Sequence, residues 1–91
     1  MTANLTTGEL LREGIRLLAP ALEQPRLDAE LLLAHVLETH RARLRSHPEE
    51  GRGPHERARY LELVERRTRG EPLAYLVGRK AFWSLELAVG P

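Results

Sequence analysis

Histidine, serine and carboxylate side chains are the groups in this sequence that could carry acid–base, nucleophilic or metal chemistry. The four histidines are His35, His40, His47 and His55. None of them belongs to an HxxxH or comparable pair that would place two imidazoles on one helical face, as a zinc site requires. Ser46 and Ser84 lack a nucleophile-elbow context, and Asp28 has no second carboxylate on its helical face. We therefore predict no catalytic residue and no metal site in this chain.

The tripeptide Gly51-Arg52-Gly53 also lacks the setting of a phosphate-binding loop. It lies between prolines in the polar stretch 48–54, and no strand precedes it. We therefore expect no cofactor to bind to these 91 residues. The pattern favours a recognition or scaffold module, because none of the usual catalytic arrangements is present.

The stretch from Leu27 to Leu37 is the element around which the rest of the chain must be arranged. Its apolar side chains spread around nearly the whole circumference of a helix, and only a narrow polar strip runs through Asp28 and His35. Asp28 lies in the first turn, where the helix dipole favours an anion, so we interpret it as structural. A helix that is apolar on most sides must be covered on most sides, which predicts a central, buried helix.

The segment before this helix is amphipathic and is predicted to cover one of its faces. Thr6 and Glu9 have the spacing of a capping box, which predicts the start of a helix. Pro20 ends its regular part near Leu18. Pro25 then suits the first turn of the central helix, where its missing N–H has no acceptor.

Two shorter features follow the central helix. We expect a short helix over residues 41–46, with Thr39 as its cap. Prolines and glycines crowd the stretch 48–54, which predicts a surface loop.

A further covering helix is predicted from Pro54 to Gly70, with Gly70 at its C-terminal cap. The residues expected on its buried face are Ala58, Leu61, Val64 and Thr68, with Tyr60 at the edge. Outward ion pairs are expected from Glu62 to Arg66 and from Glu65 to Arg69.

The hydrophobic periodicity changes from that of a helix to that of a strand near the end of the chain. Residues 71–78 predict a short helix, and residues 80–89 show the alternation of a β-hairpin. The predicted fold class is therefore all-α: a small bundle of four to five helices around a central buried helix, with a C-terminal β-hairpin or extended linker. We place the helical domain at residues 1–78 and the hairpin linker at 79–91.

Composition limits the cellular setting. The sequence has no run of about 18 apolar residues and no basic segment followed by an apolar one at its start. We therefore expect no membrane contact and a cytoplasmic location. Residues 1–40 carry a net charge of −3 and the remainder +4, so the second half could face an acidic partner.

Five motifs in one order carry a family resemblance. They are RLDAELLLAHVL (26–37), RARL (41–44), HPE (47–49), YLELVERRTRGEPLAYLVG (60–78) and KAFWSLELAVGP (80–91). In this order the chain resembles the N-terminal region of the HemK/PrmC family, the peptide chain release factor glutamine methyltransferases. The chain departs from the family pattern at Ser84, where the family usually has Gly. It also departs at residues 38–40, where a Gly-containing connection is more typical.

The resemblance implies a fold and a function for the whole protein. In that family a helical domain is joined by a β-hairpin to a catalytic domain that uses S-adenosylmethionine to methylate the glutamine of the GGQ motif in class I release factors. The cofactor loop and the Asn-Pro-Pro-Tyr motif of that family are absent from these 91 residues. The resemblance therefore implies that this chain recognises the release factor, contacts its own catalytic domain and carries no catalytic or cofactor-binding residue.

Arginines of the second half are the candidate contact surface for the release factor. They are Arg41, Arg43, Arg45, Arg66, Arg67 and Arg69. Phe82 and Trp83 are interpreted as interdomain packing residues. Two alternatives stay open: a nucleic-acid-binding helical domain, suggested by the excess of arginine, and a structural or dimerising bundle. We expect no direct nucleic-acid contact, because acidic residues are interspersed with the arginines and the net charge is only +1.

Overall fold

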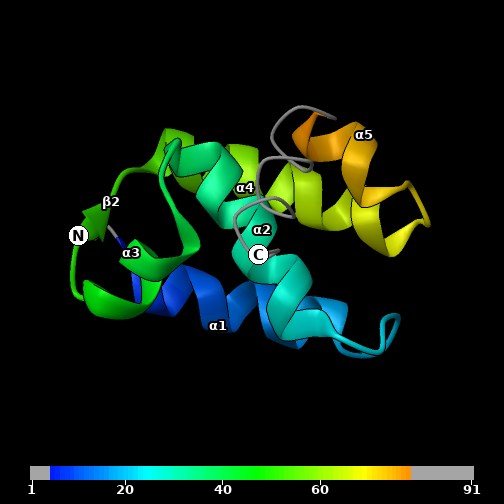
Figure 1. Cartoon of the computed structure of the whole chain (residues 1–91), viewed down its shortest axis with the longest axis horizontal. Helices are drawn as coiled ribbons and strands as arrows, with labels where there is room; N and C mark the ends of the chain where they lie inside the picture. Colours follow the sequence, from blue (N-terminus) through cyan, green and yellow to red (C-terminus); the bar gives the residue numbers. More distant parts are fainter. Residues whose placement is uncertain (1–4, 79–91) are drawn as a thin grey trace, which may run out of the picture.

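Residues 5–78 are described by a computed structural model, and they form five helices and one small sheet (Figure 1). The elements in order are β1 (Leu5–Thr6), α1 (Thr7–Leu18), α2 (Pro25–Leu37), α3 (Arg41–Ser46), β2 (Gly51–Arg52), α4 (Pro54–Thr68) and α5 (Leu73–Val77). The predicted all-α bundle is confirmed. The predicted hairpin at 79–91, with Phe82 and Trp83, lies outside the described residues.

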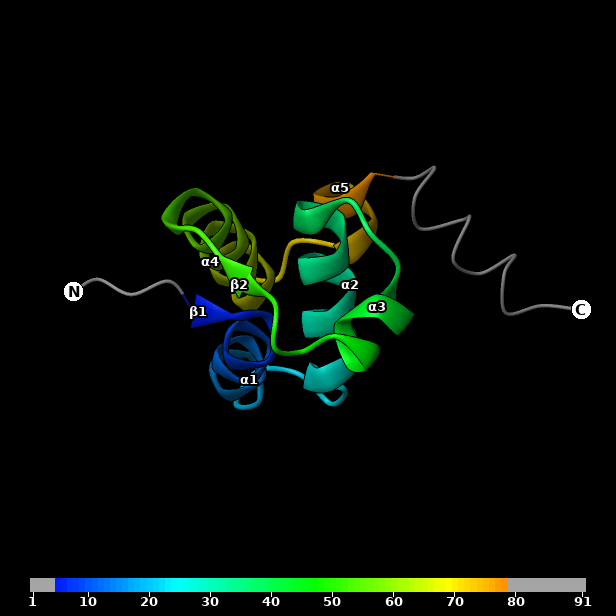
Figure 2. The same cartoon turned by 90° about the vertical axis from the view of Figure 1, so that its left-hand side faces the viewer.

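Helix α2 is central because it contacts all four other helices. Figure 2 shows α1 and α4 together on one side of α2, with α3 on the other side and α5 beside one end. Leu32 and Leu33 have no exposed surface, and Leu27 and Leu37 near the ends are half-buried. Burial of one such side chain contributes about 1.5–3 kcal/mol to stability. Enclosure of α2 therefore contributes much of the stabilising free energy of the core.

Local sequence signals place the helix ends as expected. The Thr6 hydroxyl accepts a hydrogen bond from the Glu9 N–H, and the Glu9 carboxylate accepts one from the Thr6 N–H. Pro25 and Pro54 each begin a helix, and Gly70 follows α4 with a φ of 99°. That φ lies in the left-handed region, which explains why glycine suits the position.

The buried face of α4 differs from the prediction. Tyr60, placed at the edge from the sequence, is fully buried together with Val64, whereas Ala58 is exposed. The reason is tertiary: the Tyr60 ring packs against Gly14 of α1, where the missing side chain leaves room for it. The predicted Glu65–Arg69 pair forms at 2.7 Å, but Arg66 pairs with Glu71 beyond the helix instead of Glu62.

Two other local predictions are wrong. Residues Gly51–Arg52 lie at the surface, within the stretch 48–54 that is predicted as a loop, but they form a strand that pairs antiparallel with Leu5–Thr6. Thr39 does not cap α3, whose N-cap is His40 without a side-chain hydrogen bond. In the first case, the strand partner lies more than forty positions away in the sequence, beyond the reach of a local pattern.

Helix length and composition bear on membrane insertion. Within residues 5–78, none of the helices combines the length and the apolar character that crossing a membrane requires.

The contact between Gly14 and Tyr60 gives the first testable prediction. A β-carbon at position 14 would overlap the Tyr60 hydroxyl, so Gly14→Ala is expected to lower the free energy of unfolding by about 1–3 kcal/mol despite the better helix propensity of alanine. Tyr60→Phe alone is expected to leave stability unchanged or raise it, because the buried Tyr60 hydroxyl has no hydrogen-bond partner in the described part of the chain.

Urea denaturation measures both changes. Gly51→Ala is the matched control, since a β-carbon there meets no atom of the described residues within 4 Å. Equal stability of the Gly14→Ala and Gly51→Ala variants would show that α1 and α4 are not packed through this contact.

Candidate functional site

A buried carboxylate on the central helix is the most unusual polar feature of the described residues. The Glu30 side chain in α2 has no exposed surface. An ionised carboxylate removed from water is costly unless charged hydrogen-bond donors surround it. Glu30 therefore requires cationic partners, and the fold supplies three.

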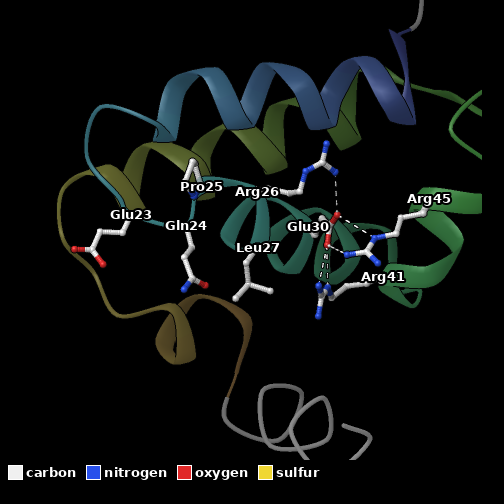
Figure 3. Close-up of a pocket in the computed structure, with 8 residues that line it drawn as sticks. All are labelled: Glu23, Gln24, Pro25, Arg26, Leu27, Glu30, Arg41 and Arg45. Carbon is white, nitrogen blue, oxygen red and sulfur yellow. Dashed lines mark hydrogen bonds and ion pairs between the residues drawn. The ribbon is translucent and has the colours of Figure 1, made fainter.

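Three arginines from two helices hold Glu30 (Figure 3). Arg41 donates from Nε and Nη2 to Oε1, at 3.1 and 2.9 Å. Arg45 donates from Nε to Oε2 at 3.3 Å and from Nη2 to Oε1 at 3.0 Å. Arg26 completes the group from α2 itself, with Nη1 at 3.4 Å from Oε2. We call Glu30 with these three arginines the Glu30 cluster.

Local structure explains how α3 delivers two arginines to one carboxylate. Glu38 adopts a left-handed conformation with φ 55° after α2, and the chain then reverses into α3. Arg41 and Arg45 are four residues apart, so they share one face of that helix. Leu44, only 1% exposed, anchors α3 in the core. Arg43 lies off this face and pairs with Glu50 at 2.6 Å.

Opposing effects act on the pKa of Glu30. Burial raises it, but hydrogen bonds from Arg45 and Arg41 and the charges of both guanidiniums lower it below its ordinary value of 4.5. The carboxylate is therefore ionised at neutral pH. The cluster carries three positive charges against one negative charge, so a charge of +2 remains at its surface.

A pocket of about 390 Å³ lies beside the Glu30 cluster. Its walls include Pro25 and Leu27 at the start of α2 as well as the four residues of the cluster. Figure 3 shows the guanidiniums gathered around Glu30 at one end, with Glu23 and Gln24 toward the other. An apolar wall beside fixed cationic donors suits recognition of an anion on a hydrocarbon stem.

The six arginines predicted as a contact surface do not gather in one place. Arg41 and Arg45 meet at Glu30, whereas Arg67 of α4 donates to Asp28 at 2.7 Å. Asp28 and Glu30, two residues apart, point to different sides of α2. The structure thus divides the set between the α3 side and the α4 side of the central helix (Figure 2).

The arginines at the end of α4 have structural partners. Arg66 donates from Nε to both carboxylate oxygens of Glu71, at 3.0 and 3.2 Å. Arg67 donates to the Glu71 carbonyl at 2.9 Å as well as to Asp28. These hydrogen bonds join the connection between α4 and α5 to α2. They agree with the interpretation of Asp28 as a structural residue.

Sequence reasoning missed Glu30 and Arg26. The signal was present, since Glu30 interrupts a nearly continuous apolar helix and stands four residues after Arg26. Its link to Arg41 and Arg45 depends on the turn at Glu38, within the connection 38–40 where the chain departs from the family pattern. Within residues 5–78, no three His, Asp or Glu side chains converge as a metal-binding group.

Comparison with known proteins identifies the family. The model of the PrmC N-terminal domain matches residues 9–78, which is most of the chain. The chain belongs to the PrmC N-terminal domain family. This confirms the resemblance stated from the five motifs.

Curated relatives with known names are similar in sequence along most of this chain. A release factor glutamine methyltransferase of Aliivibrio fischeri is 40% identical over 89 residues, which cover 97% of this chain and 31% of the relative. That of Moorella thermoacetica is 40% identical over 91 residues, covering 100% and 31%. That of Coxiella burnetii is 49% identical over 67 residues, covering 74% and 24%. The chain thus spans about a quarter to a third of the length of these relatives.

Replacement of the buried carboxylate gives the second prediction. Glu30→Gln is expected to lower the free energy of unfolding by about 2–3 kcal/mol at pH 7, because the three guanidiniums lose their shared anion. The pKa of Glu30 is lowered on folding, so its contribution is complete above about pH 4.5 and is lost as the pH falls through the lower folded value. The free energies of unfolding of the original protein and the Glu30→Gln variant are therefore expected to become equal at acidic pH.

Denaturation curves from pH 7 down to pH 2 measure this convergence. Glu65→Gln is the control, because Glu65 pairs with Arg69 at an exposed site and such pairs contribute less than about 1 kcal/mol. An equal cost of both substitutions at pH 7 would contradict an organising role for Glu30.

Proposed function

We propose that this chain is the substrate-recognition domain of a methyltransferase that modifies the GGQ glutamine of class I release factors. Membership of the PrmC N-terminal domain family is the observation that carries the proposal. The relatives named above are release factor glutamine methyltransferases, and this chain aligns with only a quarter to a third of their length. The catalytic domain and the site for S-adenosylmethionine belong, in this proposal, to the remainder of a cytoplasmic enzyme.

The charged residues suggest how the domain would hold its partner. The proposed contact residues are the arginines on the α3 and α4 sides of α2, namely Arg41, Arg43, Arg45, Arg66, Arg67 and Arg69. Residues 79–91, with Phe82 and Trp83, would provide the linker and the packing against the catalytic domain. Binding energy from contacts remote from the reacting glutamine would position that glutamine at the cofactor.

Ion pairing makes the nucleic-acid alternative less attractive. Each of the six arginines has a carboxylate partner within the described residues. A guanidinium already paired with a carboxylate releases fewer counterions when it meets a phosphate, so a steep salt dependence is not expected. The dimerising alternative lacks a large apolar patch among residues 5–78, where Leu17 and Tyr75 are the large apolar side chains that are exposed.

Deletion of the helical domain tests the proposal. In the full-length enzyme, removal of residues 1–78 is expected to lower kcat/KM for an intact release factor by at least about tenfold, the equivalent of about 1.4 kcal/mol of lost binding energy. A short peptide that contains the GGQ glutamine is the control substrate, and its kcat/KM is expected to change little because it cannot reach the domain.

Two further measurements make the result decisive. Calorimetric binding of S-adenosylmethionine reports whether the remaining protein is folded. An unchanged kcat/KM for the intact release factor, in protein that binds the cofactor normally, would reject the recognition role.

A further inference from the structure

The Glu30 cluster differs from the other ion pairs in its charge balance. Elsewhere the proposed contact arginines are matched by carboxylates, as in Arg66–Glu71, Arg67–Asp28 and Arg69–Glu65. At Glu30 three arginines share one carboxylate. The surplus positive charge among these arginines is therefore concentrated beside the pocket at the start of α2.

The exposed donors of the cluster are available to a ligand. The Arg26 and Arg45 side chains are 67% and 59% exposed, although both touch the buried Glu30. A guanidinium has five N–H donors, and Arg26 uses only Nη1 on Glu30. Arg45 is oriented by two hydrogen bonds to the buried Glu30 carboxylate, so its remaining donors are preorganised for a second anion, and Arg26 adds free donors beside them.

Two other features of the pocket favour an anion with an apolar stem. Asp28 in the first turn of α2 is paired with Arg67, and no side chain of residues 5–78 caps the N-terminus of this helix, so the positive end of the helix dipole adds to the guanidinium charge. Pro25 and Leu27 provide apolar wall next to these donors. Glu23 also borders the pocket, but its carboxylate points away from the three guanidiniums (Figure 3).

We propose that this pocket receives a glutamate or aspartate side chain from an apolar segment of the protein partner. The partner carboxylate meets Arg26 and Arg45 opposite Glu30, and the neighbouring apolar groups pack on Pro25 and Leu27. The assignment of the partner rests on the proposed function, and it narrows the contact surface from six arginines to one pocket that includes Arg26.

The pocket chemistry is tested on the 91-residue chain with two blocked peptides. The probes are acetyl-Leu-Glu-Leu-amide and its neutral counterpart acetyl-Leu-Gln-Leu-amide, titrated while the arginine Nε–H signals are followed by NMR. The glutamate peptide is expected to shift the Arg26 and Arg45 signals saturably, and the glutamine peptide is expected not to. Shifts by both peptides, or by neither, would overturn the proposal.

Substitution of Arg26 supplies the matched comparison. Arg26→Gln removes one charge while Arg41 and Arg45 still hold Glu30, so the fold is retained, as an unchanged Tm would verify. Arg26→Gln is expected to weaken binding of the glutamate peptide about fivefold, the effect typical of losing a partly exposed ion pair. Arg59→Gln removes the same charge from an exposed position of α4 and is expected to have no effect on peptide binding.

A thymidine oligonucleotide tests whether the pocket prefers phosphate to carboxylate. If it binds more tightly than the glutamate peptide, as followed by the Arg26 and Arg45 Nε–H signals, the proposal is overturned in favour of a phosphate ligand.

Kinetics of the full-length enzyme separate this inference from the proposed function. Arg26→Gln is expected to raise KM for an intact release factor without changing kcat, and Arg59→Gln is expected to change neither. If deletion of residues 1–78 lowers kcat/KM but Arg26→Gln does not, the recognition role stands and the pocket assignment falls. If the deletion has no effect while the glutamate peptide still binds at Arg26, the recognition role falls and the carboxylate site stands without this partner.

Discussion

Enclosure of α2 is the constraint on which the described structure depends. Its apolar side chains point in nearly every direction, so no single neighbour could keep them from water. The chain meets this requirement by crossing α2 with α1 and α4 on one side and placing α3 and α5 against it elsewhere (Figure 2). The four covering helices are amphipathic or short, because each has to bury only one face.

Glu30 and Asp28 are buried carboxylates on this otherwise apolar helix, and Glu30 explains the position of α3. A six-residue helix has little stability of its own, and α3 contributes Leu44 as its one fully buried apolar residue. The two guanidiniums that α3 directs to Glu30 join it to α2 by a second kind of interaction. The same contacts leave a surplus of positive charge at the surface, so a stabilising arrangement also creates a candidate recognition site.

Sequence patterns predicted features that depend on neighbouring residues. The capping box at Thr6, the prolines that begin α2 and α4 and the central helix itself all follow from local rules of capping and periodicity. Burial of Tyr60 depended on the absence of a side chain at Gly14 in another helix. The role of Glu30 depended on the turn at Glu38, which brings Arg41, eleven residues after Glu30 in the sequence, back to that carboxylate. Such features need the path of the chain in three dimensions, which periodicity does not contain.

The functional account joins family membership to a charge distribution. The chain belongs to the PrmC N-terminal domain family, its relatives named above are release factor glutamine methyltransferases, and the Glu30 cluster is the place where we propose that a partner is held. Hydrogen exchange of the full-length enzyme, with and without an intact release factor, tests this account most directly. The account predicts slower amide exchange at residues 23–27 and 41–45 when the release factor is bound. Protection confined to regions outside the helical domain would contradict it.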